Sequence, residues 1–175
     1  RGDSGTTQPS DLNDTRNTQP ALFVLESLLV DNLRQQGRDA TLLAGHSLGE
    51  LVALYAAGVF DLETGLRLMK TRSELMAAAG GGGMTAVIGF DRSQLDELVH
   101  AADGLFIAND NSDGQVVLSG RPDALASICD ALTCKRAIPL AVSGAFHSPF
   151  MANAAEQFAT ELDRLPFPDA TIPVL

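Results

Sequence analysis

The stretch Thr41–Glu50, TLLAGHSLGE, joins a short apolar run to a glycine-rich turn and the start of a helical pattern. Residues Thr41–Gly45 are typical of a short buried strand, and the apolar residues of Leu48–Val59 predict a helix. The turn between them, Gly45–Gly49 (GHSLG), fits the G-x-S-x-G pattern of a nucleophile elbow. This order of strand, turn and helix predicts an α/β layer built on a mostly parallel sheet.

Ser47, at the centre of the turn, is the candidate nucleophile. A sharp strand-to-helix turn strains the backbone at the serine, and the flanking glycines let the two elements approach closely. The backbone N–H of Leu48, at the start of the helix, is placed to donate to a developing oxyanion. The alternative is a glycine-rich turn that serves packing only.

An activated serine needs a base within hydrogen-bond reach, and the chain has three histidines. His46 adjoins Ser47, so its side chain is expected to point elsewhere. His100 falls on the polar face of a predicted helix and is expected to be solvated. His147 lies in the loop GAFHSP, just after the last predicted strand of an inserted module. Position alone therefore favours His147 as the base.

Arg72 is a candidate for binding an anion. The helix predicted over residues 61–79 has an apolar stripe made of Leu66, Met69, Leu75 and Met76. An arginine turned inward beside this stripe would be costly unless an anion paired with it, and a guanidinium suits a carboxylate. Spacing alone favours the alternative, a surface arginine bonded to Glu74 or Asp61.

The composition changes at Gly80–Gly83, a run of glycines too flexible for the interior of an element. The pattern after it predicts the order β-α-β-β-α-β, which is typical of a ferredoxin-like module. We therefore expect an α/β-hydrolase-like catalytic subdomain over residues 1–80 and 143–175, incomplete in this chain. Residues 81–142 are expected to form the ferredoxin-like small subdomain.

The two ends of the chain are less regular. Residues 1–19 are polar and rich in helix breakers, and Pro20 fits the first turn of a helix that stops at Gly37. The C-terminal TIPVL resembles the start of a strand, which suggests that the fold is cut short there.

Composition excludes several classes of function. A formal net charge of −10 argues against nucleic acid as the main partner, because phosphate binding needs a surplus of Lys and Arg. Cys129 and Cys134 have no histidine pair at metal-ligand spacing and are expected to be reduced thiols, so no metal site is predicted. No apolar run reaches the length of a membrane span, and a cytoplasmic location is expected.

Five segments then point to a known family. They are, in chain order, LNDTRNTQPALF (Leu12–Phe23), GHSLGE (Gly45–Glu50), RLMKTRSELM (Arg67–Met76), IANDNSDGQVVLSG (Ile107–Gly120) and SGAFHSPFM (Ser143–Met151). In this order they resemble the malonyl-CoA:acyl carrier protein transacylase family, the acyltransferases of fatty acid synthesis. The resemblance covers nearly all of residues 12–175. The fold it implies is an α/β-hydrolase-like core with an inserted ferredoxin-like subdomain.

The resemblance implies a role for each candidate residue. Ser47 would carry the malonyl ester, and His147 would act as base and later as acid. Arg72 would hold the free malonyl carboxylate, and the N–H of Leu48 would donate to the oxyanion. A backbone carbonyl, rather than an acid, orients the histidine in this family.

Two further residues are carried over from the family. Gln19, in TQP, matches a glutamine near the active site and is a weaker candidate. Phe146, in AFHS, resembles the malonyl-selecting form of this loop, because related domains that accept methylmalonyl carry a smaller residue there. Its bulk is expected to exclude an α-methyl group, a discrimination of about 1–3 kcal/mol.

The chain departs from the family pattern in two ways. The family begins with a GQGSQ motif, whose first glutamine completes the oxyanion hole, and continues beyond the equivalent of Leu175. The sequence therefore resembles an internal fragment that lacks both ends. Because losing one oxyanion donor typically costs about 10²–10³ in rate, we expect the chain alone to be feeble or inactive.

The expected reaction is ping-pong transfer of malonyl from malonyl-CoA to the phosphopantetheine thiol of acyl carrier protein, with no metal or redox cofactor. The chain is expected to be monomeric and to meet its acidic carrier through Lys70, Lys135 and Arg136.

Three alternatives remain. They are an acyltransferase domain of a polyketide synthase, a serine thioesterase or other hydrolase, and a non-enzymatic fragment that binds carrier protein or coenzyme A. A hydrolase would want an acid between Ser47 and His147, and none of the candidates stands out at a strand end: Asp103, Asp110 and Asp123.

Overall fold

The structure is a computed structural model that describes residues 11–175, so residues 1–10 of the predicted first subdomain lie outside the described residues. It is an α/β fold with a small antiparallel sheet. The helices are α1 (Thr15–Gln35), α2 (Leu48–Ala56), α3 (Leu62–Ala78), α4 (Arg92–Ala101), α5 (Pro122–Ala131) and α6 (Ala152–Leu162), with a 3₁₀ turn, η1, at Pro149–Met151. The strands are β1 (Gly83–Phe90), β2 (Leu105–Ser112), β3 (Gln115–Gly120) and β4 (Cys134–Pro139).

Helix α1 begins earlier than the sequence pattern indicated. Pro20 was expected in the first turn, but it lies inside α1, which starts at Thr15. Asp14 is the N-cap, and its carboxylate accepts a hydrogen bond from the backbone N–H of Arg16 at 2.9 Å. This cap satisfies a free donor of the first turn, and it was overlooked because a proline is the stronger sequence signal for a helix start. The consequence is that Gln19 sits on a helix and not in a loop.

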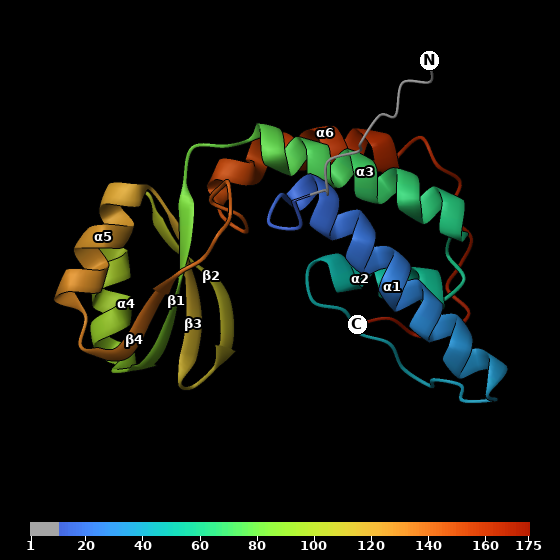
Figure 1. The fold of residues 1–175 in the computed structure, drawn as a ribbon, viewed down its shortest axis with the longest axis horizontal. Helices are drawn as coiled ribbons and strands as arrows, with labels where there is room; N and C mark the ends of the chain where they lie inside the picture. The colour runs from blue at the N-terminus through green and yellow to red at the C-terminus, as the bar shows by residue number, and fades with distance from the viewer. Residues whose placement is uncertain (1–10) are drawn as a thin grey trace, which may run out of the picture.

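Helices α1, α2, α3 and α6 form one body with its own core, which we call the helical body (Figure 1). Asp61 is the N-cap of α3, and its carboxylate accepts a hydrogen bond from the backbone N–H of Thr64 at 2.8 Å. The buried side chains of this core are Phe23, Leu48, Leu51, Val52, Leu68 and Met69.

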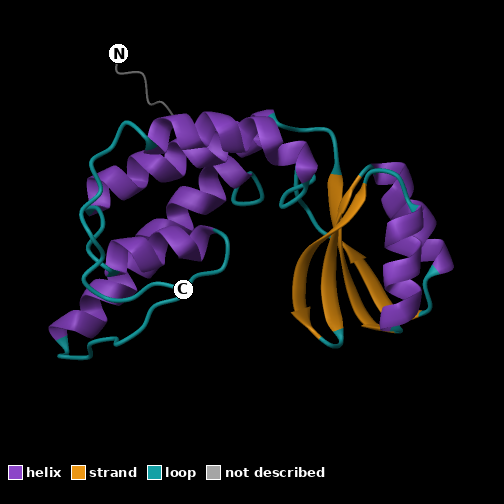
Figure 2. Ribbon diagram, turned by 180° about the vertical axis from the view of Figure 1, so that it is seen from behind, coloured by secondary structure: helices purple, strands orange, loops and turns teal. Residues whose placement is uncertain are grey.

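The four strands form a separate antiparallel sheet with the order β2-β3-β1-β4. Along the chain its elements follow the order β-α-β-β-α-β, and α4 and α5 cover one face of the sheet (Figure 2). We call the segment Gly83–Pro139 the sheet module. Its core is made of Val87, Leu95, Leu105, Val116, Leu118, Leu125, Ile128 and Leu132.

The predicted parallel sheet is not formed by the described residues. The expected strand Thr41–Gly45 contributes a single parallel bridge, Leu43 with Val174. The N–H of Leu43 donates to Pro173 O, and the N–H of Leu175 donates to Leu43 O, each at 2.9 Å. A parallel strand needs neighbours along its length, and among residues 11–175 only the C-terminal TIPVL segment supplies one.

The sheet module joins the helical body through two adjacent segments of chain. It is entered after α3 and left after β4, and the N–H of Leu140 donates to Met84 O at 2.9 Å where the two segments run together. A third apolar cluster lies on the other face of the sheet, which is turned toward the helical body. Its buried members are Met84, Ala86, Val117 and Phe146. Figure 1 shows the two bodies side by side.

Among residues 11–175, no helix has both the length and the apolar character needed to cross a membrane.

Because the two bodies have separate cores, a cavity in one should loosen that body first. Leu118 of β3 is fully buried, so Leu118→Ala should destabilise the sheet module by about 2–5 kcal/mol. Hydrogen exchange read peptide by peptide should show faster exchange in β1–β4 and little change in α1–α3. Uniform acceleration across both bodies would contradict this and would mean that they unfold as one unit.

Candidate active site

Ser47 occupies a strained turn between the bridge residue Leu43 and the start of α2. Its backbone has φ 57° and ψ −109°, a conformation that residues with a side chain rarely adopt. Gly45 makes the turn possible, because a Cβ on it would lie 2.0 Å from the backbone C and O of Gly49. Gly49 has open space around its own Cβ position. The strain and the close approach are those of a nucleophile elbow.

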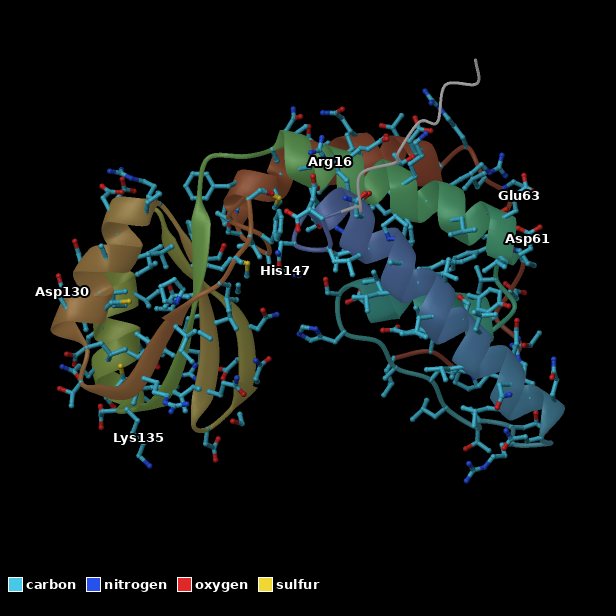
Figure 3. The ribbon with its side chains drawn as sticks, viewed as in Figure 1. Arg16, Asp61, Glu63, Asp130, Lys135 and His147 are labelled. Atoms are coloured by element: carbon cyan, nitrogen blue, oxygen red, sulfur yellow. The ribbon has the colours of Figure 1, made fainter. Side chains whose placement is uncertain are left out.

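His147 meets Ser47 across the site. The Ser47 Oγ and His147 Nε2 are 2.9 Å apart, although the two residues are 100 positions apart in the chain. His147 also has a positive φ, 56°. The next residue holds this loop, since the Ser148 hydroxyl donates to Ala145 O at 2.6 Å and accepts from the N–H of Phe150. In Figure 3 His147 lies between the sheet module and the helical body.

Arg72 points into the site, so the alternative of a surface arginine bonded to Glu74 or Asp61 is wrong. Its Nη2 donates to Ser47 Oγ at 3.0 Å, and its Nη1 donates to Gln19 Oε1. Burial lowers the pKa of the guanidinium from its ordinary value, and the nearby carboxylate of Glu50 opposes this shift. A largely buried cation therefore stands beside the candidate nucleophile.

Gln19 is held by two residues that sequence reasoning missed. It is 6% exposed, and its Nε2 donates to Thr15 Oγ1 at 2.8 Å and to Met76 Sδ at 3.2 Å. Thr15 precedes Gln19 by four positions on α1, and Met76 follows Arg72 by four positions on α3. Residues four apart share a helix face, so this spacing could have drawn attention to both.

His46 points away from Ser47, toward the sheet module. Its Nε2 lies 3.1 Å from Asn109 Nδ2 on β2, at a place where the pairing of β2 with β3 shifts register. Asn109 lies in the IANDNS segment, and no local pattern indicates a role for it. The contact ties the elbow of one body to a strand of the other.

Leu48 and Phe146 take different positions relative to the site. The backbone N–H of Leu48 opens α2, and among the described residues it has no acceptor, as an oxyanion donor requires. Phe146 is 7% exposed and packs on the sheet face with Met84 and Val117. Because Phe146 directly precedes His147, this packing holds the His147 loop against the sheet.

A cavity of about 180 Å³ lies next to Arg72 and His147, between α3 and α6. It is mostly apolar, and Phe146 does not line it. Its other lining residues are Leu75, Met76, Met151, Ala154, Ala155 and Phe158.

No carboxylate among residues 11–175 hydrogen-bonds to His147. The acids weighed for a hydrolase lie in ion pairs of the sheet module. Asp110 pairs with Arg92 at 2.6 Å, and Asp103 and Asp123 pair with Arg121 at 3.3 and 2.5 Å. The described residues also contain no cluster of three His, Cys, Asp or Glu side chains suited to a metal ion.

The family to which this arrangement of Ser47, His147 and Arg72 belongs follows from comparison with known proteins. The model of the acyl transferase domain family matches residues 5–174. The chain belongs to this family. It is 52% identical over 161 residues to the malonyl CoA-acyl carrier protein transacylase of Synechocystis, covering 92% of this chain and 55% of that protein.

Solved structures of acyltransferases share the fold. The crystal structure of the Synechocystis malonyl-CoA:ACP transacylase superposes with a TM-score of 0.92 at 50% identity, over 97% of this chain and 58% of that one. A type II polyketide-synthase acyl-carrier protein has been solved in complex with its malonyl-transacylase, which matches at 38% identity and a TM-score of 0.86, over 93% and 56%. The chain therefore spans about half the length of the relatives that it matches.

The two elbow glycines should respond in opposite ways to one added methyl group. Gly45→Ala forces a Cβ into the backbone of α2 and should destabilise the chain by about 1–3 kcal/mol. Gly49→Ala meets nothing and replaces a helical glycine, so it should stabilise by about 0.5–1 kcal/mol. Denaturant unfolding of both variants measures the difference, and equal effects would contradict this account of the turn.

The candidate base should be neutral at neutral pH. Burial, and then the charges of Arg72 and His46, lower the pKa of His147 below its ordinary 6.5, while Glu50 acts in the opposite direction. A lowered pKa leaves the imidazole free to accept a proton down to more acidic pH. The rate at which a neutral sulfonyl fluoride labels Ser47 should therefore rise with pH through a midpoint below 6.5. Arg72→Met should move that midpoint upward, and a parent midpoint above 6.5 would refute the assignment.

Proposed function

We propose that this chain carries the site of a malonyl-CoA:acyl carrier protein transacylase, an [acyl-carrier-protein] S-malonyltransferase. Ser47, with its proton accepted by His147, attacks the malonyl thioester of coenzyme A and releases the thiol. The malonyl ester on Ser47 is then attacked by the phosphopantetheine thiol of acyl carrier protein, and His147 returns the proton. The distance of 2.9 Å between Oγ and Nε2 supports this proton transfer in both half-reactions.

The observation that carries the proposal is the guanidinium of Arg72 beside the nucleophile. Its Nη2 is 3.0 Å from Ser47 Oγ, so an acyl group bound to Ser47 places its own free carboxylate within reach of Arg72. A neutral acyl group would leave this largely buried cation without an anion. A serine thioesterase of neutral acyl groups has no use for such a cation, and this argues against the hydrolase alternative.

Leu48, Gln19 and Phe146 have supporting roles in the proposed reaction. We infer that the free N–H of Leu48 donates to the oxyanion, and that Gln19 holds Arg72. Phe146 would restrict the α-carbon of the acyl group through the loop that it supports, since its ring does not line the cavity beside Arg72. No metal or cofactor takes part in the proposed reaction.

The proposed architecture is an α/β-hydrolase-like core over residues 1–80 and 143–175 with a ferredoxin-like module over residues 81–142. The strand order β2-β3-β1-β4 with both helices on one face supports the module. For the core, the support is the parallel bridge next to the elbow and an apolar face of α1 that is open in this chain. That face carries Leu22, Leu25, Leu28, Leu29 and Leu33.

Acyl carrier protein is the proposed partner, because one related transacylase has been solved with its acyl-carrier protein. Lys70, Lys135 and Arg136 are exposed and are proposed to contact an acidic carrier locally. Fatty acid synthesis in the cytoplasm by a monomer is the favoured setting. The specific observation that keeps a polyketide pathway as the second candidate is the match to a type II polyketide-synthase transacylase.

The test is formation of an acyl-enzyme. The chain, and the same sequence extended to the length of its relatives, are incubated with malonyl-CoA or acetyl-CoA and weighed by intact-protein mass spectrometry. We expect a malonyl adduct that Ser47→Ala abolishes. Arg72→Ala should lower malonyl labelling by 100-fold or more, on the order of 3 kcal/mol for a lost buried ion pair, and should not lower acetyl labelling. Absence of any adduct on the folded, extended protein would sink the proposal.

A further inference from the structure

The thioether of Met76 is one of two acceptors that hold the buried amide of Gln19. The Nε2 of Gln19 donates to Met76 Sδ at 3.2 Å and to Thr15 Oγ1 at 2.8 Å, while Oε1 accepts from Arg72 Nη1. Each polar atom of this side chain therefore has a partner inside the protein. The four residues come from two helices, with Thr15 and Gln19 on α1 and Arg72 and Met76 on α3.

The two acceptors constrain the amide differently. A threonine hydroxyl both donates and accepts, so Thr15 can bond to either end of the Gln19 side chain if the amide rotates by half a turn. A thioether accepts weakly and cannot donate. Met76 therefore favours only the orientation in which the NH₂ group faces sulfur and the oxygen faces Arg72. Of the two acceptors, the longer contact is therefore the one that adds to the orienting effect of the Arg72 donor.

The orientation matters because of what it does to Arg72. With Oε1 facing the guanidinium, Nη1 is bound and Nη2 is left directed at Ser47 Oγ, 3.0 Å away. In the reversed orientation the NH₂ group would face another donor, and Arg72 would lose its anchor. Met76 also lines the cavity beside Arg72, so the sulfur lies at the boundary between the amide and the proposed acyl site.

We propose that Met76 is a positioning residue for the acyl carboxylate. By fixing the amide of Gln19, it keeps Nη1 of Arg72 engaged and leaves Nη2 available to the carboxylate of the acyl group. The inference rests on the proposed malonyl transfer. It assigns to the thioether a polar role in a helix where methionine would otherwise count only as packing.

The test compares four substitutions in the extended protein, three on α3 and Thr15→Val on α1. Met76→Leu keeps the volume and removes the acceptor, whereas Met76→Gln restores an acceptor oxygen. Met69→Leu makes the same change on the same helix at a fully buried site outside the active site. Selective ¹⁵N labelling follows the side-chain NH₂ of Gln19, and steady-state kinetics compare malonyl-CoA with acetyl-CoA.

We expect Met76→Leu to shift the Gln19 NH₂ resonances and to increase their exchange with solvent. It should raise KM for malonyl-CoA by roughly 3- to 10-fold with kcat little changed, and should change the acetyl reaction much less. Met76→Gln should recover most of the loss, Met69→Leu should show neither effect, and Thr15→Val should disturb malonyl selection less than Met76→Leu.

Each outcome decides a separate point. An unchanged NH₂ spectrum in Met76→Leu overturns the inference, and so does a changed spectrum with an unchanged ratio of malonyl to acetyl transfer. Equal losses with both acyl donors would show a merely structural role and overturn it as well. If the parent transfers no malonyl at all, the proposed function fails, and the NH₂ spectrum alone then decides whether Met76 orients Gln19.

Discussion

The hydrogen bond between Ser47 and His147 is the contact on which the arrangement of the chain depends. It joins residues 100 positions apart, and both hold a positive φ that costs of order 1–3 kcal/mol each. Such strain persists only where the surroundings enforce it. At Ser47 the enforcement is the close contact of Gly45 with the first turn of α2, and at His147 it is the Ser148 hydroxyl bound to Ala145 O. The rest of the fold holds these two residues so that Ser47 Oγ and His147 Nε2 lie 2.9 Å apart.

The partly buried cation of Arg72 gives the site around Ser47 its electrostatic character. Arg72 lies where an uncompensated charge is costly, and the described residues offer it an amide oxygen, a hydroxyl and the more distant Glu50. None of these contacts is an ion pair. A site of this kind favours a ligand that brings the missing negative charge, so the proposed selection for a carboxylate would follow from electrostatics as well as from shape. The polar contacts of Gln19 keep that deficit aimed at the nucleophile.

The sequence predicted the parts of the site that depend on local pattern. The G-x-S-x-G turn identified Ser47, and the loop position of His147 identified its partner, because both signals are contained in a few consecutive residues. The pattern could not decide whether Arg72 faced inward, since its helix offers both an apolar stripe and nearby acids. The contact of Gln19 with Met76 joins residues 57 positions apart and depends on how α1 lies against α3, which no local pattern records.

The start of α1 was misplaced because Pro20 was a stronger signal than the Asp14 cap. The order of the elements in the sheet module could be predicted from apolar alternation and turn residues. The number of strands in the parallel sheet could not be predicted, because periodicity shows that a strand is buried and not how many neighbours it has.

The sheet module enters and leaves the helical body at one place, where the Leu140 N–H meets Met84 O and where a Cβ on Gly82 would lie 2.6 Å from the Ala145 side chain. The module is an insertion whose two ends lie side by side. The helix of Arg72 and the loop of His147 therefore remain close in space. The module can therefore change in length away from Ser47, Arg72 and His147, as long as it keeps the sheet face that packs Phe146 and the Asn109 that contacts His46. Outside those contacts, the exposed surface of the module can vary in sequence without altering the residues around Ser47.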